Sequence, residues 1–300
     1  MERCEKITTK ERPDYDIIFK DIEQKEINDS MIDYQRLFRK VQNHRPLIHC
    51  ITNYVTMNDV ANMILAAGGS PIMAQEPKEA EEIAAMCDAL VLNMGVLDEK
   101  KLEAMILAGR KANALGLPVI LDPVGVGASK FRMQSVDILL REIKCSIIRG
   151  NASEIKVLCQ REGKEKGVDA DPDDLTDTTS LLADAAALSQ RIEAVVLVTG
   201  AKDYCINQRE VYEIRNGHSM MTRITGSGCM LDGLLGVYAG ANPDCLLDAS
   251  VMAAGVLGFC GEQAAKKCQG TGSFRVGLID EMSQVTIQKI ERGMKIENKS

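Results

Sequence analysis

Polar residues that could do chemistry follow short apolar runs at four places in this chain. Asn93, Asp122, Arg149 and Thr199 each come directly after such a run. In open parallel sheets, ligands bind beyond the carboxyl ends of the strands, so residues in these positions can share one edge. We therefore expect a polar crevice there. Arg149 is the most informative of the four, because an unpaired charge at the end of a buried strand would be costly.

Two of these endings continue into segments that allow two interpretations. Asp122 opens the segment DPVGVGA, in which the glycines let the backbone pass close to a ligand, but an Asp after a strand can also simply form a turn. Arg149 opens the segment RGNASE, in which Asn151 could cap a helix with Glu154 at the capping-box position. Capping and ligand binding both remain open for these residues.

The glycine-rich turn TGSGC at 225–229 leads into an apolar helical segment. Free backbone N–H groups and the helix dipole at such a turn favour an anion, for example a phosphate or a phosphoryl group in transfer. Cys229 stands at the helix start, a position expected to lower the pKa of its thiol toward neutrality. The segment matches neither GxxxxGK[ST] nor GxGxxG, which argues against a P-loop protein and a nicotinamide oxidoreductase.

Alternating strands and helices must position these residues. Apolar runs on both sides of the pleat predict buried parallel strands, and runs with helical spacing lie between them. The pattern therefore predicts an α/β fold with a mostly parallel sheet and helices on both faces. The expected strands lie at 89–92, 118–121, 146–148 and 194–198, a hairpin at 204–206 and 211–214, and helices near 60–67, from Asp98, at 179–190 and beyond Cys229.

The chain is read as one domain, at 31–300, preceded by a charged extension, at 1–30, that is frayed or loosely docked. Its 300 residues could hold one large domain or two small ones. The polar stretch 161–178 reads as a surface loop, because the same alternation of strands and helices continues after it. One α/β domain therefore accounts for the pattern.

Composition excludes several classes of protein. A net charge of −7 and the absence of Trp argue against a general binder of nucleic acid or of anionic membranes. No apolar run is long enough to span a membrane. Ten scattered Cys without a CxxC pair or a signal peptide indicate a reducing cytoplasm, and they lack the ligand spacing of a zinc site.

Seven segments, taken in order, resemble the hydroxyethylthiazole kinases of the ribokinase-like superfamily over about residues 40–292. They are HCITNYV (49–55), GSPIMA (69–74), ALVLN (89–93), VILDPVG (119–125), IRGNASE (148–154), VTG (198–200) and TGSGC (225–229), with an echo, GTGSF, at 270–274. The resemblance implies a three-layer ribokinase-like fold with no separate lid domain. It also implies that ATP, with Mg²⁺, phosphorylates the hydroxyl of 4-methyl-5-(2-hydroxyethyl)thiazole in thiamine biosynthesis or salvage.

The resemblance assigns roles to individual positions. They are Asn53, Met73 and Gly226 for the thiazole, Arg149, Thr199 and Gly228 for ATP, and Asp122 and Glu154 for the metal. Cys229 takes the position of the superfamily's catalytic base, which is usually an aspartate. The family is typically trimeric, which implies a homotrimer with active sites at subunit boundaries.

Two other functions remain open from the sequence. The first is another small-molecule kinase of the superfamily, of the hydroxymethylpyrimidine kinase type; Cys229 in place of aspartate and the segment ITN at 51–53 argue against it. The second is a non-catalytic thiazole-binding relative, against which Asp122, Arg149 and Glu154 stand intact.

Overall fold

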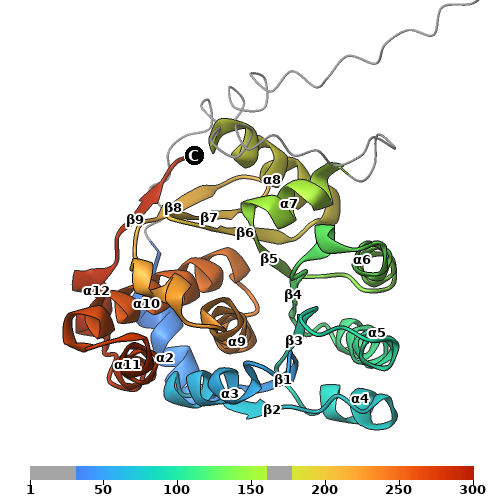
Figure 1. The fold of residues 1–300 in the computed structure, drawn as a ribbon, viewed down its shortest axis with the longest axis horizontal. Helices are drawn as coiled ribbons and strands as arrows, with labels where there is room; N and C mark the ends of the chain where they lie inside the picture. The colour runs from blue at the N-terminus through green and yellow to red at the C-terminus, as the bar shows by residue number, and fades with distance from the viewer. Residues whose placement is uncertain (1–31, 161–177) are drawn as a thin grey trace, which may run out of the picture.

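The computed structural model describes residues 32–160 and 178–300. The predicted extension 1–30 lies outside these residues, as does the predicted loop 161–178 except for Thr178. Nine strands of the described part form one sheet in the order β2-β1-β3-β4-β5-β6-β7-β8-β9 (Figure 1). They are β1 (Leu47–Ile51), β2 (Ser70–Ile72), β3 (Ala89–Asn93), β4 (Val119–Asp122), β5 (Ile147–Asn151), β6 (Val195–Thr199), β7 (Asp203–Ile206), β8 (Val211–Ile214) and β9 (Ile296–Asn298).

The sheet is mostly parallel, as predicted. Strands β1 to β6 pair in parallel, whereas β7, β8 and β9 add an antiparallel edge. The predicted hairpin is the β7–β8 pair. Every strand within the described ranges belongs to this sheet, so none of them builds a separate lid.

Helices cover both faces of the sheet and make a three-layer α/β fold (Figure 1). One face packs against α2 (Tyr34–His44), α3 (Met57–Ala66), α9 (Ser227–Ala241), α10 (Leu246–Lys267), α11 (Thr271–Ser283) and α12 (Ile287–Gly293). The other packs against α4 (Pro77–Ala84), α5 (Glu99–Ala114), α6 (Lys130–Glu142), α7 (Ala152–Gln160) and α8 (Thr178–Ile192). Side chains alternate between the faces: Ala89 and Val91 point to the first core, Leu90 and Leu92 to the second.

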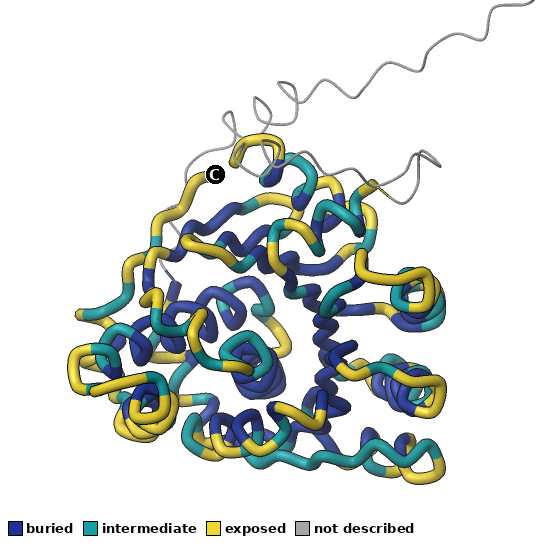
Figure 2. The backbone as a smooth tube through the Cα atoms, in the orientation of Figure 1, coloured by how far each residue is buried: buried dark blue, intermediate teal, exposed yellow. Residues whose placement is uncertain are grey.

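Helix α9 is the innermost helix of the first layer. Every residue from Met230 to Ala241 is buried, and the tube in Figure 2 is dark blue along most of this helix. The helix is apolar all round because the sheet lies on one side of it and α3 and α10 on others. Its first turn is thereby held rigidly at the edge of the sheet where the parallel strands end.

Predicted helix ends are confirmed where a specific residue was named. The Asp98 carboxylate accepts a hydrogen bond from the Lys101 backbone N–H at 2.7 Å and caps α5. Gly68 ends α3 with a φ of +93°, a left-handed conformation that favours glycine.

Three strands escaped prediction, each for a physical reason. Strand β1 carries His49 within it, which interrupts the apolar run. Strand β2 has only three residues, one of them Pro71, and β9 is a short edge strand of exposed residues. Short or polar strands of this kind are stabilised by pairing with a neighbouring strand, and the hydrophobic pattern of the segment itself does not predict that pairing.

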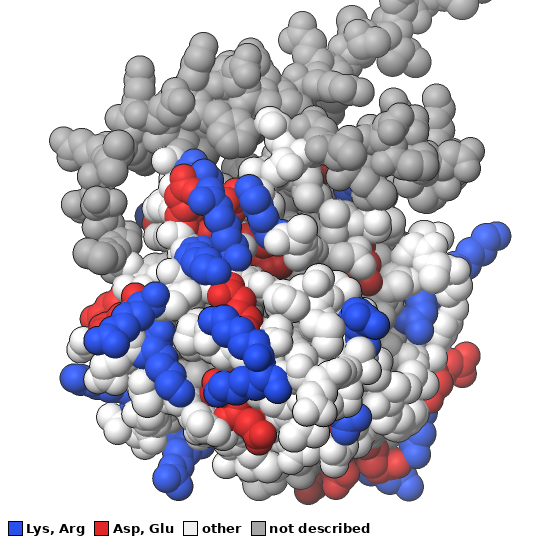
Figure 3. All heavy atoms as spheres, turned by 60° about the vertical axis from the view of Figure 1, so that its left-hand side comes forward, with Lys and Arg blue, Asp and Glu red and all other residues white. Residues whose placement is uncertain are grey.

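Across the described ranges, no helix is both long and apolar enough to cross a membrane. The side of the molecule that carries α10 to α12 shows basic and acidic side chains next to one another (Figure 3). An example is the ion pair of Lys295 with Glu262 of α10 at 2.9 Å.

Candidate active site

Polar side chains gather at the carboxyl ends of the parallel strands, where the sequence predicted a polar crevice. The strand register places Asn93 opposite Asp122 at the ends of β3 and β4, and Asn151 opposite Thr199 at the ends of β5 and β6. The Asn93 amide donates to Asp122 Oδ2 at 2.8 Å. The apolar runs thus end side by side, and their polar residues are in contact.

The predicted place of Arg149 directly after a strand is wrong: β5 continues past it to Asn151, and Arg149 lies in the middle of the strand, where it is paired on both sides. Its Nη1 donates to Asp122 Oδ2 at 2.9 Å and its Nη2 to Thr199 Oγ1 at 3.1 Å. Asp232 lies a little farther away, with its Oδ1 at 3.9 Å from Nη1. Burial disfavours the charged guanidinium, but Asp122 and Asp232 outweigh this effect and raise the pKa of Arg149. The guanidinium is therefore a fixed positive charge at the head of the sheet.

Asp122 and Asp232 form a buried pair of carboxyl groups. The Asn93 amide nitrogen bridges them, at 2.8 Å from Asp122 Oδ2 and 2.9 Å from Asp232 Oδ2. The Oδ1 atoms of both acids are buried and find no hydrogen-bond partner among the residues that the structure describes. Burial, and for Asp122 also the neighbouring Asp232, raises the pKa of both groups. One guanidinium does not balance two carboxylates, so this cluster favours an additional proton or cation.

Cys229 lies beside this cluster at the start of α9. Its sulfur accepts hydrogen bonds from the amides of Asn53 at 3.2 Å and Asn93 at 3.6 Å. The predicted lowering of its pKa is wrong: burial and the nearby Asp232 raise the pKa of the thiol to about 11. The helix dipole is outweighed because the thiol is removed from water and faces negative charge.

Asn53 is held firmly toward the sulfur. Its Oδ1 accepts hydrogen bonds from the Thr56 backbone N–H at 3.1 Å and the Thr56 hydroxyl at 3.0 Å. Its amide nitrogen is thereby left to donate to Asn93 Oδ1, at 3.3 Å, and to Cys229. The structure thus brings Asn53 and Cys229 into contact.

The two glycines of the turn are required for different reasons. Gly226 has a φ of +87°, and a Cβ there would also lie 2.5 Å from Thr56 Cγ2. At Gly228 the limit is space, because a Cβ would lie 2.5 Å from Arg149 Nη2. The close approach brings the first turn of α9, with its free N–H groups, against the guanidinium, which makes a region of positive potential.

Glu154 forms the capping box that the sequence allowed. Its backbone N–H donates to Asn151 Oδ1 at 2.9 Å, and its Oε2 accepts from the Asn151 N–H at 2.8 Å. Its Oε1 accepts from the Gly125 N–H at 2.9 Å. The carboxylate therefore joins α7 to the loop after β4, and Gly125, at a φ of +64°, lets that loop turn toward it.

Met73 stands apart from this polar network. It follows β2, is half-buried and packs against the core that includes α9. His49 of β1 fixes the neighbouring backbone, since its Nε2 lies 2.9 Å from Ala74 O. Burial lowers the pKa of His49, so the neutral ring donates this hydrogen bond, in line with the structural role expected for a histidine beside a strand.

Sequence reasoning missed two charged residues of the site. Asp232 is the one charged residue of α9 and lies one turn after Cys229, so the two share a helix face. Lys101 is 2% exposed, although it lies in the first turn of a surface helix. The sequence signal for Asp232 was a single charged residue within an otherwise apolar helix. Lys101 gave no comparable sequence signal, because lysines in the first turns of helices usually face water.

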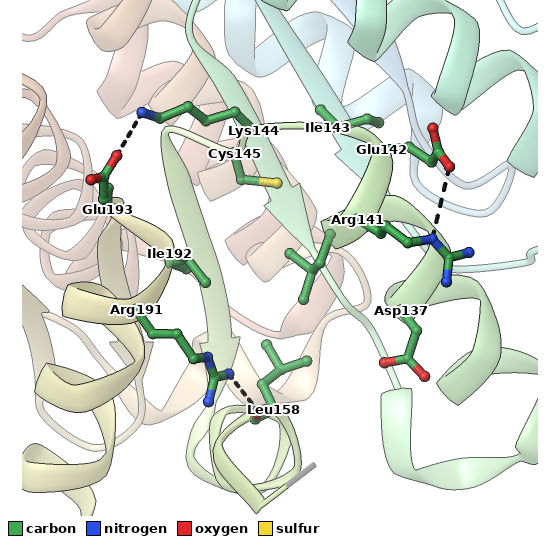
Figure 4. Close-up of a pocket in the computed structure, with 11 residues that line it drawn as sticks. Asp137, Arg141, Glu142, Ile143, Lys144, Cys145, Leu158, Arg191, Ile192 and Glu193 are labelled. Atoms are coloured by element: carbon green, nitrogen blue, oxygen red, sulfur yellow. Dashed lines mark hydrogen bonds and ion pairs between the residues drawn. The ribbon is translucent and has the colours of Figure 1, made fainter. Parts of the chain in front are cut away.

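A separate hollow of about 720 Å³ lies at the opposite edge of the sheet (Figure 4). It is bounded by the end of α6, the start of β5 and the end of α8, and Lys144 and Glu193 form an ion pair across its rim at 2.8 Å. None of the predicted site residues lines it.

Comparison with known proteins identifies relatives of this chain over most of its length. The hydroxyethylthiazole kinase of Clostridium acetobutylicum is 46% identical over 264 residues, which cover 86% of this chain and 97% of that protein. The solved hydroxyethylthiazole kinase protein of Pyrococcus horikoshii is 33% identical, with a TM-score of 0.80, and covers 90% of this chain and 100% of its own. A ribokinase-like superfamily protein of Enterococcus faecalis shares the fold at 11% identity, with a TM-score of 0.59 over 84% of this chain and 94% of its own. The profile of the hydroxyethylthiazole kinase family matches residues 38–288, and the chain belongs to this family.

Proposed function

We propose that this protein transfers the γ-phosphoryl group of ATP to the hydroxyl of 4-methyl-5-(2-hydroxyethyl)thiazole. The observation that carries the proposal is the position of Cys229 at the head of α9. Its sulfur is held by Asn53 and Asn93, and the Asp122–Arg149 pair lies beside it. An acceptor for a hydroxyl proton and a site for phosphate are thus next to each other, as in-line phosphoryl transfer requires.

The binding of ATP would rest on Arg149, Thr199 and Gly228. The guanidinium has a fixed position because it donates to both Asp122 and Thr199. The N–H groups of the glycine turn point along the helix dipole and would stabilise charge on the phosphoryl group in transfer. Positioning and charge stabilisation supply most of the catalysis in such reactions.

The thiazole alcohol would lie between Asn53, Met73 and Gly226. Met73 supplies an apolar surface, and the Asn53 amide fixes the polar end of the site. Cys229 would orient the substrate hydroxyl and take its proton as the new O–P bond forms. Because its pKa is about 11, the thiolate is a minor species at neutral pH, so the sulfur acts as a base of limited availability.

The residues present also fit a Mg²⁺ ion. Asp122 Oδ1 and Asp232 Oδ1 are buried acceptors without hydrogen-bond partners among the described residues, and Arg149 supplies only one positive charge against two carboxylates. Within the described ranges, no group of three or more His, Cys, Asp and Glu is arranged for a metal, but Mg²⁺ commonly takes one or two carboxylates, waters and phosphates. We assign Asp122 to the ion, with Glu154 acting through water because both its oxygens already accept backbone N–H groups. The ion, when bound, would neutralise phosphate charge.

We further propose that the protein acts as a homotrimer with active sites at subunit boundaries. Tyr54 and Val55, directly after Asn53, are 60% and 66% exposed, which is unusual for apolar residues beside a binding site. Light scattering after gel filtration tests this proposal. A monomer would contradict it.

A Mg²⁺-ATP phosphorylation assay tests the function. We expect the wild-type enzyme to phosphorylate hydroxyethylthiazole in preference to hydroxymethylpyrimidine. No product from the thiazole alcohol would refute the proposal, and calorimetric binding of the thiazole without ATP turnover would instead indicate a non-catalytic relative.

A further inference from the structure

Lys101 is a buried lysine that none of the steps above uses. It lies in the first turn of α5, is 2% exposed, and reaches toward the strand ends from the face opposite α9. Its Nζ donates to Thr52 O at 2.9 Å and to Gly95 O at 2.7 Å. These carbonyls belong to two different segments, the one after β1 and the one after β3.

Holding a charge at this position works against the ordinary preference of lysine for water. Burial lowers the pKa of Lys101 to about 8, while Asp98 and Cys229 favour its charged form. An apolar side chain would fill the space without this penalty but would leave two buried carbonyls without donors. A lysine at this position is therefore explained by the hydrogen-bond donors that the Thr52 and Gly95 carbonyls require.

The two carbonyls flank the amides that contact Cys229. Thr52 directly precedes Asn53, and the Gly95 backbone N–H donates to Asn93 Oδ1 at 2.9 Å. Lys101 thus joins the segment that carries Asn53 to the segment that orients Asn93. A Cβ on Gly95 would lie 2.8 Å from Asn93 Oδ1 and 2.9 Å from Asn53 Nδ2, which shows how tightly these segments meet.

Arg132 of α6 continues the same arrangement one strand farther along the sheet. Its Nη1 donates to Met94 O at 2.6 Å and to Val124 O at 2.7 Å. One cation therefore joins the segments after β1 and β3, and the next joins those after β3 and β4. Both come from the α5–α6 side, so the helices of this layer fix the edge at which the substrate would bind.

We propose that Lys101 is a positioning residue for the thiazole alcohol, acting through the Thr52 and Gly95 carbonyls to hold Asn53 and Asn93 against Cys229. The proposal rests on the proposed function for the identity of the substrate. Arg149 lies within β5 and Thr199 ends β6, and both strands lie beyond those that Lys101 joins. Loss of the lysine should therefore affect the alcohol and spare ATP.

Steady-state kinetics of Lys101→Met, with each substrate varied in turn, tests this inference. We expect the KM for the thiazole alcohol to rise about tenfold, as a small misplacement of a binding group does, while the KM for ATP stays within about twofold. Lys101→Arg should recover most of the loss, because a guanidinium can donate to both carbonyls. Lys100→Met is the matched control: its ammonium is exposed and pairs only with Glu76 among the described residues, so its kinetics should match the wild type.

Circular dichroism and thermal melting establish that each variant is folded at the assay temperature. If Lys101→Met does not fold, Lys101→Gln is compared in its place, since its amide keeps two N–H donors without the charge. Wild-type kinetics in the Lys101 variant, or equal rises in both KM values, would overturn the positioning role.

Calorimetric titration of the thiazole alcohol without ATP separates the positioning role from the proposed function. A wild-type protein that binds the alcohol but does not phosphorylate it refutes the function. A loss of affinity for the alcohol that is confined to the Lys101 variant still supports positioning. A wild type that neither binds nor turns over the alcohol refutes both.

Discussion

Replacing Gly228 with alanine should disable the enzyme by displacing Arg149. A Cβ at this position would lie 2.5 Å from Arg149 Nη2, 2.7 Å from Nη1 and 2.9 Å from Cζ. The backbone at Gly228 does not need the left-handed conformation, unlike that of Gly226. The substitution therefore tests the contact with the guanidinium and introduces little backbone strain.

The size of the effect follows from these distances. An ordinary contact begins at 3.4 Å, so the guanidinium must move by about 0.9 Å. Its hydrogen bonds to Asp122 and Thr199, at 2.9 and 3.1 Å, cannot both survive a shift of that size. A misplacement near 1 Å costs about 10²-fold in rate, or about 2.7 kcal/mol of transition-state stabilisation.

An ADP-release assay on folded protein measures this loss as kcat/KM for ATP. Gly277→Ala is the matched control, because its Cβ would lie 3.5 Å from Ala264 Cβ, an ordinary contact between α11 and α10. In an Arg149→Lys background, the added Gly228→Ala should cost less than about threefold, since the clashing group is gone. Near-normal activity of Gly228→Ala, or the same loss in both backgrounds, would refute the reasoning.

Three further predictions concern the thiols and the capping box. Cys229→Ala should be slower by about 10²–10⁴-fold but still active, whereas Cys229→Asp should retain activity; an inactive Cys229→Asp that still binds both ligands would argue against a base. Stability should fall as pH rises above about 9, because buried thiols such as Cys145, with a pKa raised by burial to about 12, keep protons that the unfolded chain loses. Each such thiol lowers the free energy of unfolding by roughly 1.4 kcal/mol per pH unit in this range. Lys101 has the opposite effect, because its lowered pKa favours the folded state as pH rises between about 8 and 10.5. Urea unfolding at pH 8, 9 and 10 measures the net effect, and a free energy of unfolding that does not fall with pH would contradict this prediction. Glu154→Ala should lower the free energy of unfolding by about 1 kcal/mol and raise the Mg²⁺ concentration needed for half-maximal rate; an unchanged Mg²⁺ requirement would leave Glu154 only its capping role.

The sequence predicted the architecture well because the relevant signals are local. Buried parallel strands need apolar residues on both faces, so the ends of β3, β4 and β6 at Asn93, Asp122 and Thr199 could be read from the runs themselves, whereas β5 continues past Arg149 to Asn151. The register then places these ends side by side, which no local pattern encodes. Contact among the four residues followed only because parallel strands of one sheet share an edge.

The electrostatics of the site could not be read in the same way. The helix start correctly located Cys229 but predicted the wrong direction for its pKa, because burial and Asp232 outweigh the dipole. Asp232 belongs to a helix that reads as core, and Lys101 to one that reads as surface. Their roles depend on hydrogen-bond partners far away in the sequence: Asp232 accepts from Asn93, and Lys101 donates to Thr52.

The charge balance of this polar cluster bears on why position 229 is a thiol, where the resemblance to the ribokinase-like superfamily implies an aspartate in most members. Asp122 and Asp232 already place two acids beside a single guanidinium, and Asp232 lies one turn from Cys229 on the same helix face. A third carboxylate there would lie next to both acids, and like charges that close together raise one another's pKa values. With a pKa of about 11, the Cys229 thiol stays protonated at neutral pH, so it adds no negative charge to the resting site. It becomes a base only as the thiolate, after it has lost its own proton. Cys229 and Asp232 are therefore best understood as one arrangement, in which the second acid on the helix favours a residue at position 229 that is neutral in the resting enzyme.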